Sequence, residues 1–151
     1  TLLDGINPER IVISAEACGI GFRALERAIA YAKERVVFDR PIGQNQAIAH
    51  PLADSYSELV AAELLWQKAA WTYDRGEPAG PLANMAKIRC ADASFRACDR
   101  ALQTLGGFGY AREYHVERYW REARLMRIAP ISQEMALNFV AEHVLELPRS
   151  Y

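Results

Sequence analysis

Polar and glycine-rich clusters fall where the hydrophobic pattern predicts that helices begin or end. These clusters are NPER (7–10), ERVVFDRPIGQNQ (34–46), QTLGGFGY (103–110) and RIAPISQE (127–134). The free N–H groups of a helix N-terminus favour anions, and an arginine such as Arg35 offers several donors to a phosphate-like group. Taken alone, Arg35 is also an ordinary partner of a helix C-terminus, and Gln103 is an ordinary exposed residue. Together, the residue types and positions indicate ligand contacts at the ends of helices.

Three glycines, Gly106, Gly107 and Gly109, interrupt a long helical pattern. A tight turn needs one or two glycines to supply a positive φ, but repeated glycines also let a backbone approach something that a Cβ would exclude. That neighbour is another chain or a ligand. Inside the first predicted helix, Gly19 and Gly21 each cost about 1 kcal/mol relative to alanine. We therefore expect close approach of another backbone there, most simply that of a helix in the same domain.

Apolar residues that recur at steps of three and four predict an all-α fold. The expected helices cover approximately residues 7–37, 46 or 51 to 73, 82–105, 116–121 and 132–145. Asn7 and Ser132 are the expected N-caps of the first and last helices. No stretch predicts a strand hairpin. The expected architecture is a single domain, an antiparallel four-helix bundle with a short extra helix.

Composition argues against several classes of function. The chain of 151 residues carries 18 Lys and Arg against 19 Asp and Glu, so no strong field attracts nucleic acid or a membrane surface. No apolar run approaches the roughly 20 residues that a membrane span needs. The three cysteines form no CxxC pair and the three histidines lack ligand spacing. We therefore expect no metal site and a reduced, intracellular setting.

Two longer blocks, YAKERVVFDRPIGQNQAIAHPLAD (31–54) and QTLGGFGYAREYHVERYWREARL (103–125), carry a family resemblance. They resemble the C-terminal helical domain of the acyl-CoA dehydrogenase family, the flavoenzymes that desaturate acyl-CoA thioesters. The resemblance covers essentially the whole chain. It implies that residues 1–151 are this domain and that the family's N-terminal helical and middle β-domains lie outside it, so we expect the chain alone to be inactive.

The resemblance also implies partners and a location. The family uses FAD, an acyl-CoA substrate and, usually, an electron-transferring flavoprotein as acceptor, and it assembles as a homodimer or homotetramer. The expected compartment is the bacterial cytoplasm or the mitochondrial matrix.

A set of FAD contacts follows from the resemblance. Arg35 corresponds to the arginine that meets the FAD pyrophosphate across the dimer interface, and a planar guanidinium suits that anion. The other positions that match FAD contacts of the family are Phe38, Gln46, Gln103, Gly106, Gly107 and Ser132. Asp39 stands where the family commonly has glycine. An acid near a pyrophosphate is unfavourable unless it points away or pairs with Arg40.

The catalytic base is missing from its usual place. The family's reaction removes the α-proton of the thioester while a hydride moves from the β-carbon to the flavin. Most members carry the base in a Tyr-Glu-Gly-Thr segment before the last helix. Here that segment is Ala129-Pro130-Ile131-Ser132, and Pro130 cannot accept a proton.

Two explanations of this departure remain open. One is a lineage that lost dehydrogenation and keeps the domain as an assembly module. The other is the alternative base of isovaleryl-CoA and long-chain enzymes, at the start of the first helix. Glu9 occupies that position, directly before Arg10, which matches the family's arginine near the substrate. An acid in a first helical turn is also favoured by the helix dipole alone. We favour Glu9 as the base, with Glu16 and Glu134 as weaker candidates.

Overall fold

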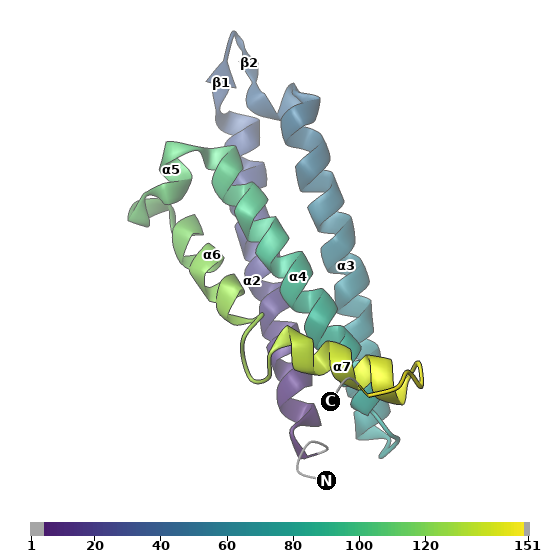
Figure 1. The fold of residues 1–151 in the computed structure, drawn as a ribbon. Coiled ribbons are helices and arrows are strands. Elements are labelled where there is room, and N and C mark those ends of the chain that lie inside the picture. Colours follow the sequence, from purple (N-terminus) through teal and green to yellow (C-terminus); the bar gives the residue numbers. More distant parts are fainter. Residues whose placement is uncertain (1–4, 150–151) are drawn as a thin grey trace.

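The computed structural model describes residues 5–149 and is almost entirely helical (Figure 1). Three long helices, α2 (Asn7–Glu34), α3 (Gln46–Asp74) and α4 (Gly80–Leu105), run side by side in alternating directions. The shorter elements are β1 (Val36–Val37), β2 (Arg40–Pro41), η1 (Ile42–Gln44), α5 (Gly107–Tyr110), η2 (Arg112–Tyr114), α6 (Val116–Leu125) and α7 (Gln133–His143). This arrangement confirms the all-α bundle that the sequence predicts.

The two shorter helices complete the bundle in different ways. α6 packs against α2 and α4 and takes the place of a fourth helix. α7 lies across the end of the bundle where α4 begins (Figure 1). Its N-cap is the predicted one, because the Ser132 hydroxyl accepts a hydrogen bond from the backbone N–H of Met135 at 3.3 Å.

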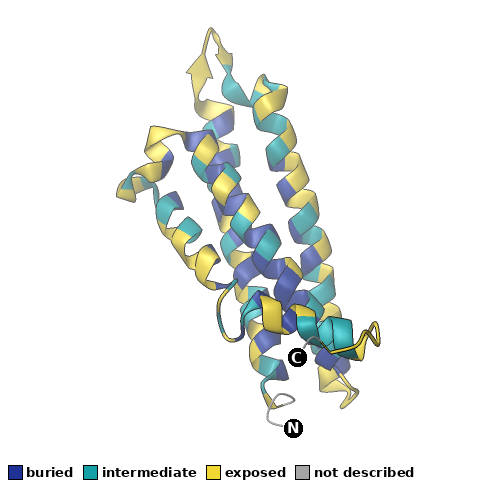
Figure 2. Ribbon diagram, in the orientation of Figure 1, coloured by how far each residue is buried: buried dark blue, intermediate teal, exposed yellow. Residues whose placement is uncertain are grey.

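The core depends on close packing of α2 against α4. Their buried faces are lined mainly by alanine, cysteine, serine and glycine: Ala17, Cys18, Gly21, Ala24 and Ala28 on α2, and Ala91, Ser94, Ala97, Cys98 and Ala101 on α4. Figure 2 shows the buried residues gathered where the long helices face one another. A Cβ added to Gly21 would lie 3.1 Å from the Cα of Ser94 and 2.8 Å from Cδ2 of Leu59. The close approach expected at Gly21 is therefore confirmed.

Three local expectations are wrong. Ile6, not Asn7, is the N-cap of α2, because Asn7 is the first helical residue and its side chain accepts a hydrogen bond from Arg10 instead. α2 ends at Glu34 rather than near Val37. Gly19 has no heavy atom of the described residues within 4 Å of an added Cβ, so the expected packing of Gly19 against a helix of the same domain is wrong. Approach of Gly19 by another chain stays a prediction.

A small hairpin joins α2 to α3, although none was expected. β1 and β2 pair antiparallel, with Val36 opposite Pro41 and Val37 opposite Arg40. The two residues of the turn, Phe38 and Asp39, both have positive φ, 51° and 62°. Tight two-residue hairpins need this backbone conformation and usually signal it with Asn-Gly or Asp-Gly. This turn has Phe-Asp in place of those pairs, so the sequence did not indicate a hairpin.

The packing at Gly21 leads to a first prediction. Gly21→Ala should lower the free energy of unfolding of the chain by about 1–3 kcal/mol, because the new methyl group meets the backbone of α4. Gly19→Ala is the matched control and should be neutral or stabilising by up to about 1 kcal/mol. Urea unfolding followed by circular dichroism measures both. Equal effects of the two substitutions would contradict the packing described for α2 and α4.

Candidate functional site

The structure separates the predicted site residues into two groups at opposite ends of the bundle (Figure 1). The first group lies where α2 ends, α3 begins and α4 ends: Arg35, Phe38, Gln46, Gln103, Gly106 and Gly107. The second group lies where α2 and α7 begin: Glu9, Arg10 and Ser132. Because α2 has 28 residues, the two ends are about 40 Å apart along its axis. The candidate site therefore consists of two half-sites.

Arg35 has a fixed backbone and an exposed side chain. Its N–H donates to the carbonyl of Tyr31 at 2.8 Å, and its own carbonyl accepts from the N–H of Ile42, also at 2.8 Å. These bonds hold the residue between α2 and the hairpin. Among residues 5–149, we find no hydrogen bond or ion pair from the Arg35 guanidinium, which leaves its donors available to an anion.

A hollow of about 500 Å³ brings Arg35 next to the glycine turn. Its lining residues are Tyr31, Arg35, Leu105, Gly107, Phe108 and Ala111. The rings of Tyr31 and Phe108 meet edge to face there, with centroids 6.2 Å apart. Sequence reasoning missed both aromatic residues. Tyr31 lies one helical turn before Arg35 and Phe108 lies between two of the glycines, so their proximity to predicted contacts was the available signal.

Glycine is favoured at the three positions of the turn for different physical reasons. Gly106 has a φ of 59°, a conformation that suits glycine best. Gly109 of α5 packs against the backbone of α4, because an added Cβ would lie 2.5 Å from the carbonyl oxygen of Leu102. An added Cβ at Gly107 would have no heavy atom of the described residues within 4 Å. Among these three glycines, Gly107 is therefore the one for which residues 5–149 supply no reason, and it lines the hollow.

Phe38 forms an exposed and strained tip. Phe38 is 93% exposed, and its backbone φ of 51° is unusual for a residue with a bulky side chain. Asp39, with φ of 62°, occupies a conformation that suits glycine and that aspartate tolerates. Of the two alternatives for Asp39, that it points away or that it pairs with Arg40, the pair is not formed, because Arg40 donates to the Asn45 side chain at 2.8 Å. Strain at an exposed residue indicates a functional contact.

We predict that Phe38→Asn leaves the free energy of unfolding unchanged or raises it by up to about 1 kcal/mol, although an aromatic ring is lost. Asparagine adopts positive φ readily, and the ring of Phe38 makes little contact within the chain. Chemical denaturation of the two proteins tests this. A loss greater than about 1 kcal/mol would show that the ring packs within the fold and that the turn is not strained.

At the opposite end, Glu9 is exposed in the first turn of α2. Its neighbour Arg10 is 3% exposed, and one guanidinium nitrogen donates to the Asn7 side chain at 2.6 Å. Arg10 therefore lies within the fold, and its contact with a substrate stays a prediction. Glu16, the weaker candidate base on the same helix, is also exposed.

Ser132 lies at this second end because two isoleucines pack together. Ile131, next to Ser132, and Ile6, next to the start of α2, belong to one apolar cluster with Ile88 of α4. The pKa of the Glu134 carboxyl is lowered, first by a hydrogen bond from its own backbone N–H and then by the Ser132 hydroxyl. A carboxylate with a lowered pKa is a poorer proton acceptor, so Glu134 is a weaker candidate base.

Lys87 is the polar residue at this end that sequence reasoning missed. It is 0% exposed in the middle of the apolar face of α4, and lysine is almost never fully buried unless it is paired. Its ammonium donates to the carbonyl of Arg127 at 3.3 Å. Burial lowers the pKa of Lys87, and Glu134 and Asp92 oppose that shift. The periodicity of α4 offered a signal, because Lys87 falls among buried positions.

Residues 5–149 contain neither a candidate membrane span nor a candidate metal site. No helix in that range is both long enough and apolar enough to cross a bilayer. Over the same range, no group of three or more His, Cys, Asp or Glu side chains could hold a metal ion.

Comparison with known proteins decides the family. The family model of the acyl-CoA dehydrogenase C-terminal domain matches residues 1–145. The chain belongs to this family. Acyl-CoA dehydrogenase FadE12 of Mycobacterium tuberculosis is 53% identical over 152 residues, which covers 99% of this chain and 39% of FadE12. The chain thus spans less than half the length of this relative.

Solved structures support the same assignment. Butyryl-CoA dehydrogenase from Megasphaera elsdenii is similar with a TM-score of 0.92 and 34% identity, over 95% of this chain and 37% of that one. A structure of PigA with FAD and proline is similar with a TM-score of 0.89 and 26% identity, over 93% of this chain and 37% of that one. The chain is therefore an acyl-CoA dehydrogenase C-terminal domain, and the family resemblance in the sequence is confirmed.

Proposed function

We propose that the protein to which this domain belongs is an FAD-dependent acyl-CoA dehydrogenase in which Glu9 is the catalytic base. The observation that carries the proposal is the division of the site residues. All predicted FAD contacts except Ser132 gather at one end of the bundle, and Glu9, Arg10 and Ser132 gather at the other. Each group supplies one part of a flavin site.

The first half-site has the features that an FAD phosphate region requires. The Arg35 guanidinium offers donors to a pyrophosphate, Gly107 leaves space for close approach of a ligand, and Tyr31 and Phe108 wall the hollow beside them. The exposed tip of Phe38 provides a further apolar contact. Asp39 adds one negative charge near this half-site, which weakens its field for a phosphate.

The two half-sites of one chain serve two different flavins. They are about 40 Å apart along α2, and an extended FAD is shorter than this helix. In a symmetric dimer, each chain gives Arg35 and the glycine turn to its partner's flavin and Glu9 to its own. This arrangement makes a homodimer the smallest active unit that we propose.

At the second half-site, Glu9 accepts the α-proton of the acyl-CoA thioester. When bound, FAD accepts the hydride that leaves the β-carbon, so the substrate loses one proton and one hydride and gains a double bond. Glu9 is suited to this role because its carboxylate is exposed at the start of a rigid helix. Ser132 caps the start of α7 at the same end of the bundle.

Glu9→Gln in the full-length, FAD-loaded protein should abolish flavin bleaching by acyl-CoA and leave FAD bound. Glutamine keeps the size of the side chain but cannot accept the proton, so we expect a loss of about 10⁴-fold or more in the rate of flavin reduction. Anaerobic mixing with a panel of acyl-CoA thioesters, followed by flavin absorbance, measures this rate.

The matched control is Glu16→Gln, an exposed glutamate on the same helix, which should keep the wild-type rate. If Glu9→Gln bleaches as fast as the wild type, Glu9 is not the base. If the wild type retains FAD but no acyl-CoA bleaches it, the lineage has lost or changed the reaction, and the assembly role becomes the better account.

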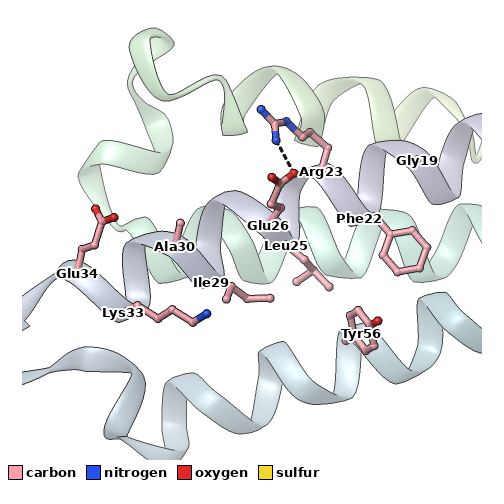
Figure 3. Close-up of a pocket in the computed structure, with 10 residues that line it drawn as sticks. All are labelled: Gly19, Phe22, Arg23, Leu25, Glu26, Ile29, Ala30, Lys33, Glu34 and Tyr56. Atoms are coloured by element: carbon pink, nitrogen blue, oxygen red, sulfur yellow. Dashed lines mark hydrogen bonds and ion pairs between the residues drawn. The ribbon is translucent and has the colours of Figure 1, made fainter.

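The assembly role has support of its own in a groove on the outer side of α2. Gly19, Phe22, Ile29 and Lys33 line it together with Tyr56 of α3, and its volume is about 770 Å³ (Figure 3). Exposed large apolar residues elsewhere on α3 include Leu64 and Trp71. A second copy of the domain fits such a surface. Because the dehydrogenase also needs a dimer, self-association supports both functions, and only flavin reduction distinguishes them.

A further inference from the structure

The segment from Ile128 to Ser132 connects α6 to α7 and lies beside the start of α2. Its own contacts with the bundle are few, since Ile128 and Pro130 are exposed and only Ile131 is buried, against Ile88 and Ala136. Polar bonds to α4 hold both of its ends. The segment stands where most of the family carries the catalytic base, but here it contains no acid.

The first polar bond comes from Lys87. Its ammonium, fully buried within the fold, donates at 3.3 Å to the carbonyl of Arg127, the residue directly before the segment. The charged and titratable groups that face Lys87 are Asp92 of α4, Arg127 after α6 and Glu134 of α7. An apolar residue of similar volume would fill this place without the desolvation cost of a buried ammonium. A role beyond packing therefore explains the lysine better.

The second set of bonds converges on Asp92, one turn further along α4. One oxygen of Asp92 accepts a hydrogen bond from the Gln133 side-chain amide at 2.8 Å and forms an ion pair with the Arg127 guanidinium, whose Nε lies 3.1 Å away. The same Arg127 nitrogen lies 2.7 Å from the side-chain oxygen of Gln133, which is 7% exposed. Arg127 and Gln133 flank the segment on its two sides. The Asp92 carboxylate thus ties the two ends of the segment to one point of α4.

We propose that Lys87 and Asp92 form a polar clamp that fixes the segment 128–132, and that they are positioning residues for the dehydrogenation. The catalytic part of this inference rests on the proposed function. Asp92, Arg127 and Gln133 set where the segment leaves α6 and enters α7, while Lys87 caps the carbonyl that precedes it. The clamp orders a segment that contains no catalytic acid, and it keeps this segment, which lies at the same end of the bundle as Glu9, in one position for substrate alignment.

The test uses the full-length, FAD-loaded protein and its Lys87→Met variant, with Lys68→Met as the control. Methionine keeps a long unbranched side chain but removes the donor, and Lys68 is an exposed lysine of α3. Hydrogen exchange is followed in the peptide that covers 126–132 and, for comparison, in the peptide that covers 103–110 at the other end. Stopped-flow flavin reduction gives the rate at saturating acyl-CoA and the substrate concentration for half-saturation.

In Lys87→Met, we expect exchange in 126–132 to rise about tenfold and exchange in 103–110 to stay unchanged. FAD content should stay the same. The acyl-CoA concentration for half-saturation should change by less than about threefold, while the rate of flavin reduction falls by about tenfold or more. The reason is that a misplaced segment 128–132 disturbs the alignment of the substrate rather than its affinity. Lys68→Met should match the wild type throughout. Asp92→Asn, a change at a partly exposed residue, should show the same pattern if Lys87→Met does not fold.

Unchanged exchange in 126–132 would overturn the clamp. A rise in exchange with an unchanged reduction rate would overturn its catalytic role and leave Glu9 as the proposed base. If no acyl-CoA reduces the wild-type flavin, the proposed function fails together with the catalytic part of the inference, and the exchange result alone then supports or overturns the clamp.

Discussion

The close approach of α2 to α4 is the constraint on which both half-sites depend. Gly21 has no room for a side chain beside the backbone at Ser94, and the neighbouring positions on both helices are mostly alanine and cysteine. Small residues along the contact between α2 and α4 keep these two helices, which are nearly equal in length, aligned from end to end. The end of α2 therefore meets the end of α4, which places Arg35 beside Gly107. A larger distance between α2 and α4 would separate Arg35 from Gly107.

Rigid helices explain how one domain can act at two distant places. The long helices fix the ends of the bundle about 40 Å apart, so the residues of one end are positioned independently of those at the other. Each end contains its own energetically unfavourable feature. At one end this is a bulky residue with positive φ, Phe38, and at the other a fully buried ammonium, Lys87. Such departures from ordinary folding rules are typical of functional sites.

The sequence predicted the bundle, the cap at Ser132 and the family, because apolar periodicity and short motifs are local properties. It did not predict the hairpin, since Phe38 and Asp39 lack the usual turn signal, and only the geometry of the connection imposes positive φ on both. It offered positive φ or close approach of another chain or a ligand for the three glycines, but it did not predict that Gly109 packs against Leu102 of the same chain, while Gly107 has no such neighbour among residues 5–149. Arg127 is bonded to Lys87, 40 positions before it, and to Asp92, 35 positions before it, and no local pattern reveals such contacts.

The central claim is that Glu9 and Arg35 of one chain serve different flavins, and a mixed dimer tests it most directly. Glu9→Gln and Arg35→Gln subunits, each inactive or strongly impaired alone, are co-expressed with different affinity tags and the heterodimer is isolated. The proposal predicts that one of its two sites has both residues intact, so flavin reduction recovers to about half of the wild-type level. Activity no higher than that of the two parent variants would contradict the proposal, because no site would then combine Glu9 of one subunit with Arg35 of the other.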